Sequence, residues 1–186
     1  MAEIPIASLK ALAREARALE IDYAFTGGSI LGLLLDSPGL TPIRPTDDVD
    51  VIVELLSRKS YSKFEDRLRE RGFINDTRQG APMCRWTFNR LTVDIIPIVG
   101  DFLGLNTIWF GHALASADDR DVGGETIRVI SASTFVATKL AAFCDRGEGD
   151  FYGSHDLEDI VAVVDGRERL EEEMIEAEES LRSYVS

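Results

Sequence analysis

An alternating segment in the first half of the chain reads Asp48-Val49-Asp50-Val51-Ile52-Val53-Glu54. Successive side chains of a β-strand point to opposite faces, so this alternation predicts a strand over residues 48–54. One face would carry Asp48, Asp50, Ile52 and Glu54, and the other would carry the three valines. The strand therefore presents two carboxylates, two residues apart, on the same side of a sheet.

A third carboxylate stands in a largely apolar segment, Leu91-Thr92-Val93-Asp94-Ile95-Ile96, which also predicts a strand. An unpaired charge in such a strand is costly to bury. Beside Asp48 and Asp50, Asp94 would complete a cluster of hard oxygens that needs a cation. Magnesium suits such a cluster because it binds few protein carboxylates together with water and substrate phosphates. Asp-x-Asp alone is frequent by chance, and an Asp at a strand end usually caps a turn, so the pair needs supporting features.

Such a feature lies upstream, where Gly27-Gly28-Ser29 follows a predicted strand over residues 22–26. Ser29 is a favourable N-cap for a predicted helix over residues 30–35. Backbone amides at a helix start, approached closely through glycine, bind phosphate. The same tripeptide also makes an ordinary turn. Together with the Asp-Val-Asp strand and the isolated Asp94, however, the turn is far more specific than any of these features alone.

The formal net charge of −13 is unevenly distributed over the 186 residues. Residues 1–100 carry a net charge of −1, residues 101–186 carry −12, and residues 56–90 carry a local excess of +5. A polyanion could use the basic stretch, although the field of the whole chain would not steer it inward. Six of these basic residues lie on one predicted helix and are interpreted as a solvated face: Arg58, Lys59, Lys63, Arg67, Arg69 and Arg71.

The two cysteines, Cys84 and Cys144, lack the spacing of a zinc site or a disulfide framework. The N-terminus has no basic-then-apolar leader, and the longest apolar run, residues 30–35, is too short to cross a bilayer. A cytoplasmic protein without a membrane segment is therefore expected.

The remaining patterns predict helices and strands in alternation up to about residue 130, followed by helices. Further helices are predicted over residues 8–19, 57–71, 133–144, 155–164 and 167–184, and strands over 73–75, 84–88, 91–97 and 126–130, with a hairpin around Asn89-Arg90.

The run from Gly27-Gly28-Ser29 to Arg44-Pro45-Thr46-Asp47-Asp48-Val49-Asp50 resembles the nucleotidyltransferase signature of the AbiEii/AbiGii-type toxin family. A second signature of that family resembles Lys139 in a helix, then Arg146, then Asp156. The resemblance extends from about Tyr23 to Val164. The family belongs to bacterial toxin–antitoxin and phage-defence systems.

The resemblance implies an α/β (α+β) fold, the minimal polymerase-β-like nucleotidyltransferase fold, with a small mixed sheet flanked by helices. Residues 1–130 would form the core, and residues 131–186 would form a helical part packed on it. Asp48, Asp50 and Asp94 would bind two Mg²⁺ ions, and Lys139 and Asp156 would join them in catalysis. The implied nucleotide-binding residues are Gly27, Gly28, Ser29, Arg44, Thr46 and Arg146.

The implied reaction transfers a nucleoside monophosphate from a nucleoside triphosphate to an acceptor hydroxyl. An RNA 3′ end, especially of tRNA, fits the resemblance and the basic stretch, and a cognate antitoxin would then be a partner. A small cationic acceptor such as an aminoglycoside fits the acidic surface. A protein hydroxyl is a third acceptor, and a nucleotide-binding module without turnover is the alternative to an enzyme.

Several of these residues also have plain structural interpretations. Lys139 could extend to solvent from an apolar helix, and Arg44 could be a loop charge. Asp159 is expected in a helix-surface ion pair, and His155 as a helix cap. Trp109 and Phe110 are expected in the core of a loop-rich stretch rather than as a surface on which a base stacks.

Overall fold

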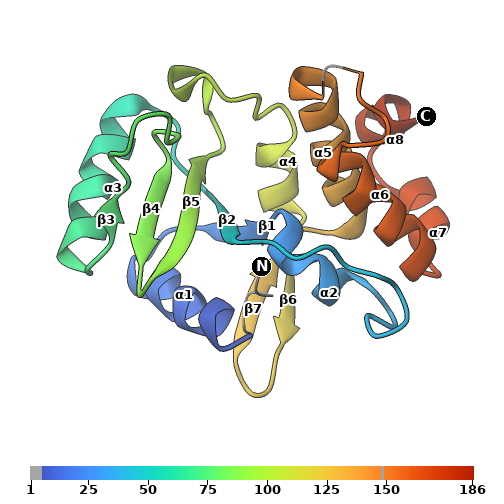
Figure 1. Ribbon diagram of the computed structural model, residues 1–186, viewed down its shortest axis with the longest axis horizontal. Coiled ribbons are helices and arrows are strands. Elements are labelled where there is room, and N and C mark those ends of the chain that lie inside the picture. Colours follow the sequence, from blue (N-terminus) through green and yellow to red (C-terminus); the bar gives the residue numbers. More distant parts are fainter. Residues whose placement is uncertain (1–5, 148) are drawn as a thin grey trace.

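A computed structural model describes residues 6–147 and 149–186. Within these residues the strands form one mixed sheet in the order β3-β4-β5-β2-β1-β7-β6 (Figure 1). The strands are β1 Tyr23–Thr26, β2 Asp48–Val53, β3 Ile74–Asn75, β4 Arg85–Phe88, β5 Leu91–Pro97, β6 Asp118–Asp121 and β7 Thr126–Val129. Helices flank the sheet, so the predicted fold class is confirmed.

The helices are α1 Ile6–Ala18, α2 Leu31–Leu34, α3 Arg58–Glu70, α4 Phe110–Ala115, α5 Ala132–Arg146, α6 His155–Gly166, α7 Leu170–Glu176 and α8 Glu179–Val185. Two short 3₁₀ turns, η1 Gly28–Ile30 and η2 Asp101–Leu103, complete the set. Helix α4 packs on β1 and β2, and α5 packs on α4, α6, α7 and α8. The C-terminal helices thus lie to one side of the sheet in Figure 1. The expected division at residue 130 stays a prediction.

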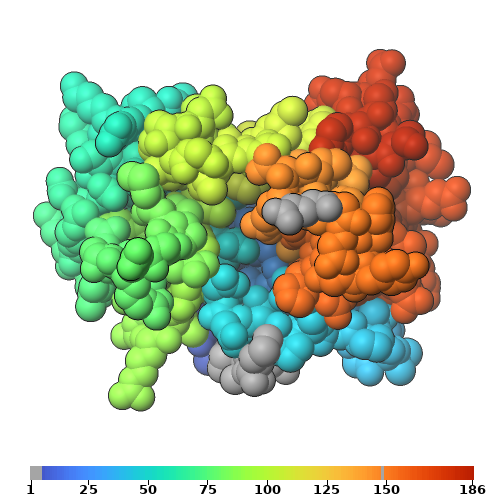
Figure 2. All heavy atoms as spheres, turned by 45° about the horizontal axis from the view of Figure 1, so that its top comes forward, coloured from blue at the N-terminus to red at the C-terminus, as the bar shows by residue number. Residues whose placement is uncertain are grey.

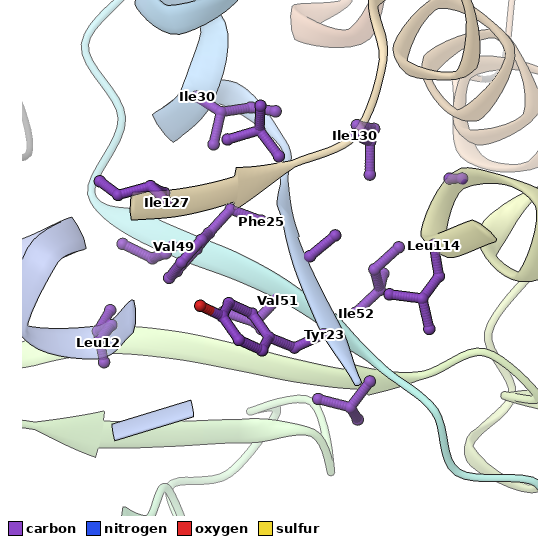
Figure 3. Close-up of a cluster of buried hydrophobic side chains, with 14 of the residues drawn as sticks. Leu12, Tyr23, Phe25, Ile30, Val49, Val51, Ile52, Leu114, Ile127 and Ile130 are labelled. Atoms are coloured by element: carbon purple, nitrogen blue, oxygen red, sulfur yellow. The ribbon is translucent and has the colours of Figure 1, made fainter. Parts of the chain in front are cut away.

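The centre of the sheet is the predicted alternating strand. Strand β2 pairs antiparallel with β1 and parallel with β5, with Asp50 opposite Asp94. Val49, Val51 and Val53 are buried, as alternation predicts. Figure 3 shows part of this core, in which Val49 and Val51 share one cluster with Tyr23 and Phe25 of β1. Burial of the valine face fixes the register of β2, because a slip of one residue would exchange its two faces.

Local signals explain most element boundaries. Ser57 caps α3 in a capping box with Ser60, and Gly72 follows the helix in a left-handed conformation with φ of 84°. Asn89 and Arg90 join β4 to β5 with φ of 50° and 70°, the backbone that a two-residue hairpin turn requires. The predicted hairpin is therefore confirmed.

A helix is present within residues 30–35, as predicted, but its predicted cap was wrong, and so was the extent of the last helix. Residues 28–30 form a 3₁₀ turn after Gly27, and Ser29 donates its hydroxyl to the carbonyl oxygen of Thr26 at 3.4 Å instead of capping a helix. Only Leu31–Leu34 is α-helical in this region. The single helix expected over residues 167–184 is divided into α7 and α8 by extended backbone at Ala177 and Glu178. This bend allows Leu170 and Leu181 both to be buried.

Two elements had no prediction. Strand β6 reads Asp118-Asp119-Arg120-Asp121 and therefore has no apolar alternation, but it lies at the edge of the sheet, where charged side chains are favoured. Helix α4 lies in the stretch expected to be loop, where Ala113 and Leu114 are buried. Within the described part of the chain, no helix combines the length and the apolar character needed to cross a membrane.

Candidate functional site

Three carboxylates on neighbouring strands meet at one cleft. Asp48 and Asp50 project from β2, and Asp94 projects from β5 beside Asp50. All three, here called the carboxylate cluster, line a cleft of about 640 Å³. Asp94 is buried, whereas Asp48 and Asp50 are partly exposed. Figure 2 shows this region as a hollow between the green segment of β4 and β5 and the orange helices α5 and α6.

The carboxylate cluster already holds a cation, Arg85 of β4. Its Nε donates to Asp94 Oδ1 at 2.8 Å, and its Nη2 donates to Asp94 Oδ2 at 2.7 Å and to Asp48 Oδ2 at 3.2 Å. In the sequence, Arg85 is only one of the charges of the basic stretch over residues 56–90. The predicted hairpin could have located it, because a two-residue turn at Asn89-Arg90 places Arg85 directly opposite Asp94.

The opposite wall of the cleft is formed by α5 and α6. Lys139 of α5 is buried, and its Nζ lies 3.1 Å from Asp156 Oδ1 and 2.7 Å from Asp159 Oδ2. Arg146, two helical turns further along α5, donates two hydrogen bonds of 3.1 Å to Asp156. Lys139 therefore meets anions rather than extending to solvent, and it lines the same cleft as Asp48.

Asp159 extends this wall to the loop before β2. Arg44 donates from Nε and Nη2 to the two Asp159 oxygens at 2.9 and 3.0 Å. Asp159 is fully buried, so the expectation of a surface ion pair was wrong. Its spacing of three residues from Asp156 places both carboxylates on one face of α6. We call Arg44, Lys139, Arg146, Asp156 and Asp159 the helical ion-pair network.

The glycine turn brings the backbone against the carboxylate cluster. Gly27 has a φ of 72°, and a Cβ atom there would lie 1.9 Å from Asp50 Oδ2. A Cβ atom on Gly28 would lie 2.9 Å from Arg44 Nη2. Gly28 lines the cleft, whereas Gly27 lines an adjoining hollow of about 220 Å³ that shares Asp50 and Lys139 with it. Glycine is therefore required at position 27, where the backbone has a positive φ and Asp50 lies too close for a side chain. A side chain at position 28 would have to displace the end of Arg44.

Ser29, Thr46 and Phe110 do not line the cleft itself, whereas His155 does. Ser29 and Thr46 line an adjoining cavity of about 640 Å³ that shares Gly28 and Arg44 with the cleft. Thr46 also donates its hydroxyl to Asp48 Oδ1 at 3.2 Å. His155 is the first residue of α6, and the cap is Ser154, which accepts from the Leu157 amide. Phe110 lines the hollow beside Asp50.

The electrostatics of the cleft differ between its two walls. Burial, with the charges of Asp48 and Asp94, raises the pKa of Asp50 to about 7, against lowering contributions from Lys139 and Arg146. Burial also favours a raised pKa for Asp156, but hydrogen bonds from Arg146 and the charge of Lys139 outweigh it and lower the pKa. Asp50 is therefore partly protonated near neutral pH, whereas Asp156 is ionised.

The carboxylate cluster suits a divalent cation in its chemistry, because its donors are hard carboxylate oxygens from two rigid strands. In residues 6–147 and 149–186, however, no three His, Cys, Asp or Glu side chains are already arranged around one ion position. Arg85 binds both oxygens of Asp94 and one of Asp48, so the donors are correct but are engaged by a guanidinium. Cys84 also lines the cleft, and burial raises its pKa to about 12, so it stays a thiol.

The pKa of Asp50 leads to a stability prediction for the protein in EDTA. The unfolded Asp50 loses its proton near its ordinary pKa of 3.8 and the folded one near 7, so the folded state binds more protons between these pH values. Stability should therefore fall as pH rises from 4 to 7. Asp50→Asn removes this loss, and its melting temperature should exceed that of the wild type by at least about 3 °C more at pH 8 than at pH 5.

Thermal unfolding at the two pH values measures this difference. Asp66→Asn, a change at an exposed position on α3, serves as the control. If Asp50→Asn changes the melting temperature equally at both pH values, the pKa of the Asp50 carboxyl is not raised in the folded protein.

No protein-family model and no curated protein sequence matches the chain. Solved structures do match its fold. A nucleotidyltransferase-like antigenic protein from Paracoccidioides brasiliensis has a TM-score of 0.60 at 17% identity, covering 96% of this chain and 90% of its own. The antibiotic-resistance factor ANT(2″)-Ia in complex with adenylyl-2″-tobramycin has a TM-score of 0.54 at 13% identity, covering 95% of each chain. The lincosamide adenylyltransferase LnuA has a TM-score of 0.50 at 12% identity, covering 87% and 99%. The chain therefore has a nucleotidyltransferase-like fold.

Proposed function

We propose that this protein is a magnesium-dependent nucleotidyltransferase that moves a nucleoside monophosphate from a nucleoside triphosphate to an acceptor hydroxyl. The observation that carries the proposal is the shared cleft, in which the carboxylate cluster faces Lys139 and Arg146. Carboxylates and cations facing each other across a cleft suit a metal-bound triphosphate, whose charges they complement. The fold likeness to two adenylyltransferases supports the same reaction class.

In this proposal Asp48, Asp50 and Asp94 would hold two Mg²⁺ ions. When bound, these ions neutralise charge on the attacking and leaving oxygens. The acceptor hydroxyl oxygen attacks the α-phosphorus, the bond to the β-phosphate breaks, and pyrophosphate leaves. Asp94 would take the hydroxyl proton. Thr46 orients Asp48 through the hydrogen bond to its Oδ1.

The helical ion-pair network would bind the triphosphate from the opposite wall. Asp156 holds Lys139 and Arg146 by direct hydrogen bonds, and the Arg146 side chain is 70% exposed, so its outer surface is free to meet phosphate. The backbone at Gly27 and Gly28 would approach the phosphates closely because neither residue has a side chain, and Ser29 would bind them beyond the turn. Arg44 is held by Asp159 and lies against Gly28, and from this position it would contact the nucleotide.

Two acceptors follow from different observations. Asp150 at the cleft and the net charge of −12 over residues 101–186 favour a small cationic acceptor of the aminoglycoside kind. The resemblance to the toxin family favours an RNA end, with tRNA and a cognate antitoxin as partners in the cytoplasm. The basic stretch gives RNA little support. Arg67 and Arg69 of α3 and Arg71 after it bond to the Leu19 carbonyl, Asp66 and Glu15 respectively, and none of the three lines the cleft.

A transfer assay tests the proposal. Each of the four nucleoside triphosphates, labelled at the α-phosphate, is incubated with Mg²⁺, the protein and one acceptor class: aminoglycosides, total RNA or total protein. We expect label to appear in one acceptor class, with release of pyrophosphate, and to disappear with EDTA. No transfer to any acceptor, together with no change in melting temperature with Mg²⁺ and any triphosphate at millimolar concentration, would contradict the proposal.

Lys139→Ala should raise the KM for the nucleoside triphosphate by about 10- to 100-fold, the loss expected for a charge-assisted hydrogen bond to phosphate. Folding should suffer less, because Arg146 still holds Asp156 and Arg44 still holds Asp159. Lys139→Arg should recover only part of the loss, because the guanidinium differs in shape and reach. Initial rates and thermal unfolding measure both effects, with exposed Lys63→Ala on α3 as the control. If Lys139→Ala destabilises the fold as much as it impairs binding of the nucleotide, Lys139 has a structural role alone.

A further inference from the structure

Arg85 takes up the oxygens that a metal ion in the carboxylate cluster would need. Its guanidinium forms a fork with both Asp94 oxygens, at 2.8 and 2.7 Å, and reaches Asp48 Oδ2 at 3.2 Å. Such a two-point contact between a planar guanidinium and a carboxylate is among the stronger ion pairs in proteins. One side chain therefore engages three of the six oxygens of the carboxylate cluster.

The position of Arg85 follows from the sheet. Strand β4 pairs antiparallel with β5 and places Arg85 directly opposite Asp94, while β5 pairs parallel with β2 and places Asp94 beside Asp50. The three carboxylates repel one another, and a positive charge among them offsets that repulsion. Arg85 supplies this charge from the chain itself.

A metal ion and this guanidinium would compete for the same position. A divalent cation within a few ångströms of a guanidinium is strongly repelled inside a protein, where screening is weaker than in water. The Arg85 side chain is 25% exposed and lines the cleft of about 640 Å³, so it has room to turn away. The side chain of Asp94 is 10% exposed and stays fixed in the central strand β5.

We propose that Arg85 is an internal counter-ion that competes with divalent metal for Asp48 and Asp94, so that the metal ion binds as the guanidinium leaves. This inference rests on the proposed function, because it takes the carboxylate cluster as the metal site. Arg85 then sets the metal affinity of the protein in the absence of nucleotide. It stabilises the metal-free cleft at the expense of metal binding.

Binding of Mn²⁺ tests this competition without any measurement of activity. Free Mn²⁺ is counted by electron paramagnetic resonance during titration of the wild type, Arg85→Gln and the matched control Arg78→Gln. Arg78 is 76% exposed and pairs with Asp76 outside the cleft, so its substitution removes the same charge without touching the carboxylate cluster. We expect Arg85→Gln to bind Mn²⁺ at least about tenfold more tightly than the wild type, a gain of about 1.4 kcal/mol. Arg78→Gln should bind it as the wild type does.

Unchanged or weaker Mn²⁺ binding by Arg85→Gln would overturn the inference, since Arg85 would then remain in place and support the ligands. If Arg85→Gln does not fold without metal, Arg85→Lys decides, because lysine keeps the charge but loses the fork. We expect it to bind Mn²⁺ more tightly than the wild type, and equal affinity would again overturn the inference.

Asp48→Asn separates the two proposals: if it binds Mn²⁺ as the wild type does, the metal site itself is wrong and both proposals fail. If it loses Mn²⁺ but neither Arg85 variant gains affinity, only the role of Arg85 falls.

Discussion

Asp48→Ala should lower the rate of nucleotide transfer by at least about 100-fold, since loss of even an indirect partner of a metal ligand costs about 10- to 100-fold. Asp48 is expected to bind metal directly and contributes one of the three carboxylates in the cleft. The fold should survive the substitution, because Asp48 is partly exposed and its removal relieves repulsion with Asp50 and Asp94. Arg85 keeps both of its hydrogen bonds to Asp94 in the variant.

The adjacent residue provides the matched control for this prediction. Asp47 is exposed and does not line the cleft, so Asp47→Ala removes the same charge one position away. Initial rates at saturating Mg²⁺ and circular dichroism, measured for both variants, separate catalysis from folding. Turnover of Asp48→Ala equal to that of Asp47→Ala would remove Asp48 from the mechanism.

Asp159→Ala should reduce the free energy of unfolding by about 3–5 kcal/mol, the range for breaking a buried ion pair from one side. Asp159 is fully buried and lies between Arg44 and Lys139. Its removal leaves two cations with little access to water, and it frees the loop before β2 from α6. The loss of stability should therefore exceed that caused by substitution of Asp156, the other carboxylate of the helical ion-pair network.

Urea denaturation of Asp159→Ala and Glu158→Ala measures this difference. Glu158 is the preceding residue of α6 and is exposed, so its substitution should change stability by less than about 0.5 kcal/mol. A loss below about 1 kcal/mol for Asp159→Ala would mean that Arg44 and Lys139 find other partners or water. The link between α6 and the loop before β2 would then contribute little to stability.

Local patterns predicted the elements that carry the carboxylate cluster. Alternation in residues 48–54 gave the strand and the face of Asp48 and Asp50, and the apolar run around Asp94 gave its neighbour. The pairing of β2 with β5 could not be read from either segment, because it joins positions more than 40 residues apart in the sequence. The family resemblance, rather than the pattern of residues, placed Lys139 and Asp156 beside them.

Features that depend on tertiary contacts were not predicted. Arg44 and Asp159 are 115 residues apart, and neither has a local signal for the other. Ser29 looked like an N-cap because its residue type favours that position, yet the backbone at Gly27 turns the chain into a 3₁₀ turn instead. The charged strand β6 has no apolar period and is held by its pairing with β7. In each case partners that are distant in the sequence, or an unusual backbone angle, outweighed local propensity.

The two charged groups of the cleft also differ in how the chain builds them. The carboxylate cluster stands on β2 and β5 at the centre of the sheet, where neighbouring strands fix its spacing. The helical ion-pair network stands on α5, α6 and the loop before β2, and its own ion pairs hold it together. Substitutions in the carboxylate cluster should therefore affect activity more than stability. Those in the buried part of the helical ion-pair network should affect both.

The most direct measurement is a crystal structure of the protein with Mn²⁺ and an α,β-methylene nucleoside triphosphate, which cannot lose pyrophosphate. We expect anomalous density for Mn²⁺ in contact with the Asp48 and Asp50 carboxylates, with the phosphates between that density and Lys139 and Arg146. Nucleotide bound elsewhere, such as in the cavity beside Ser29, with no Mn²⁺ density at Asp48 or Asp50, would contradict it.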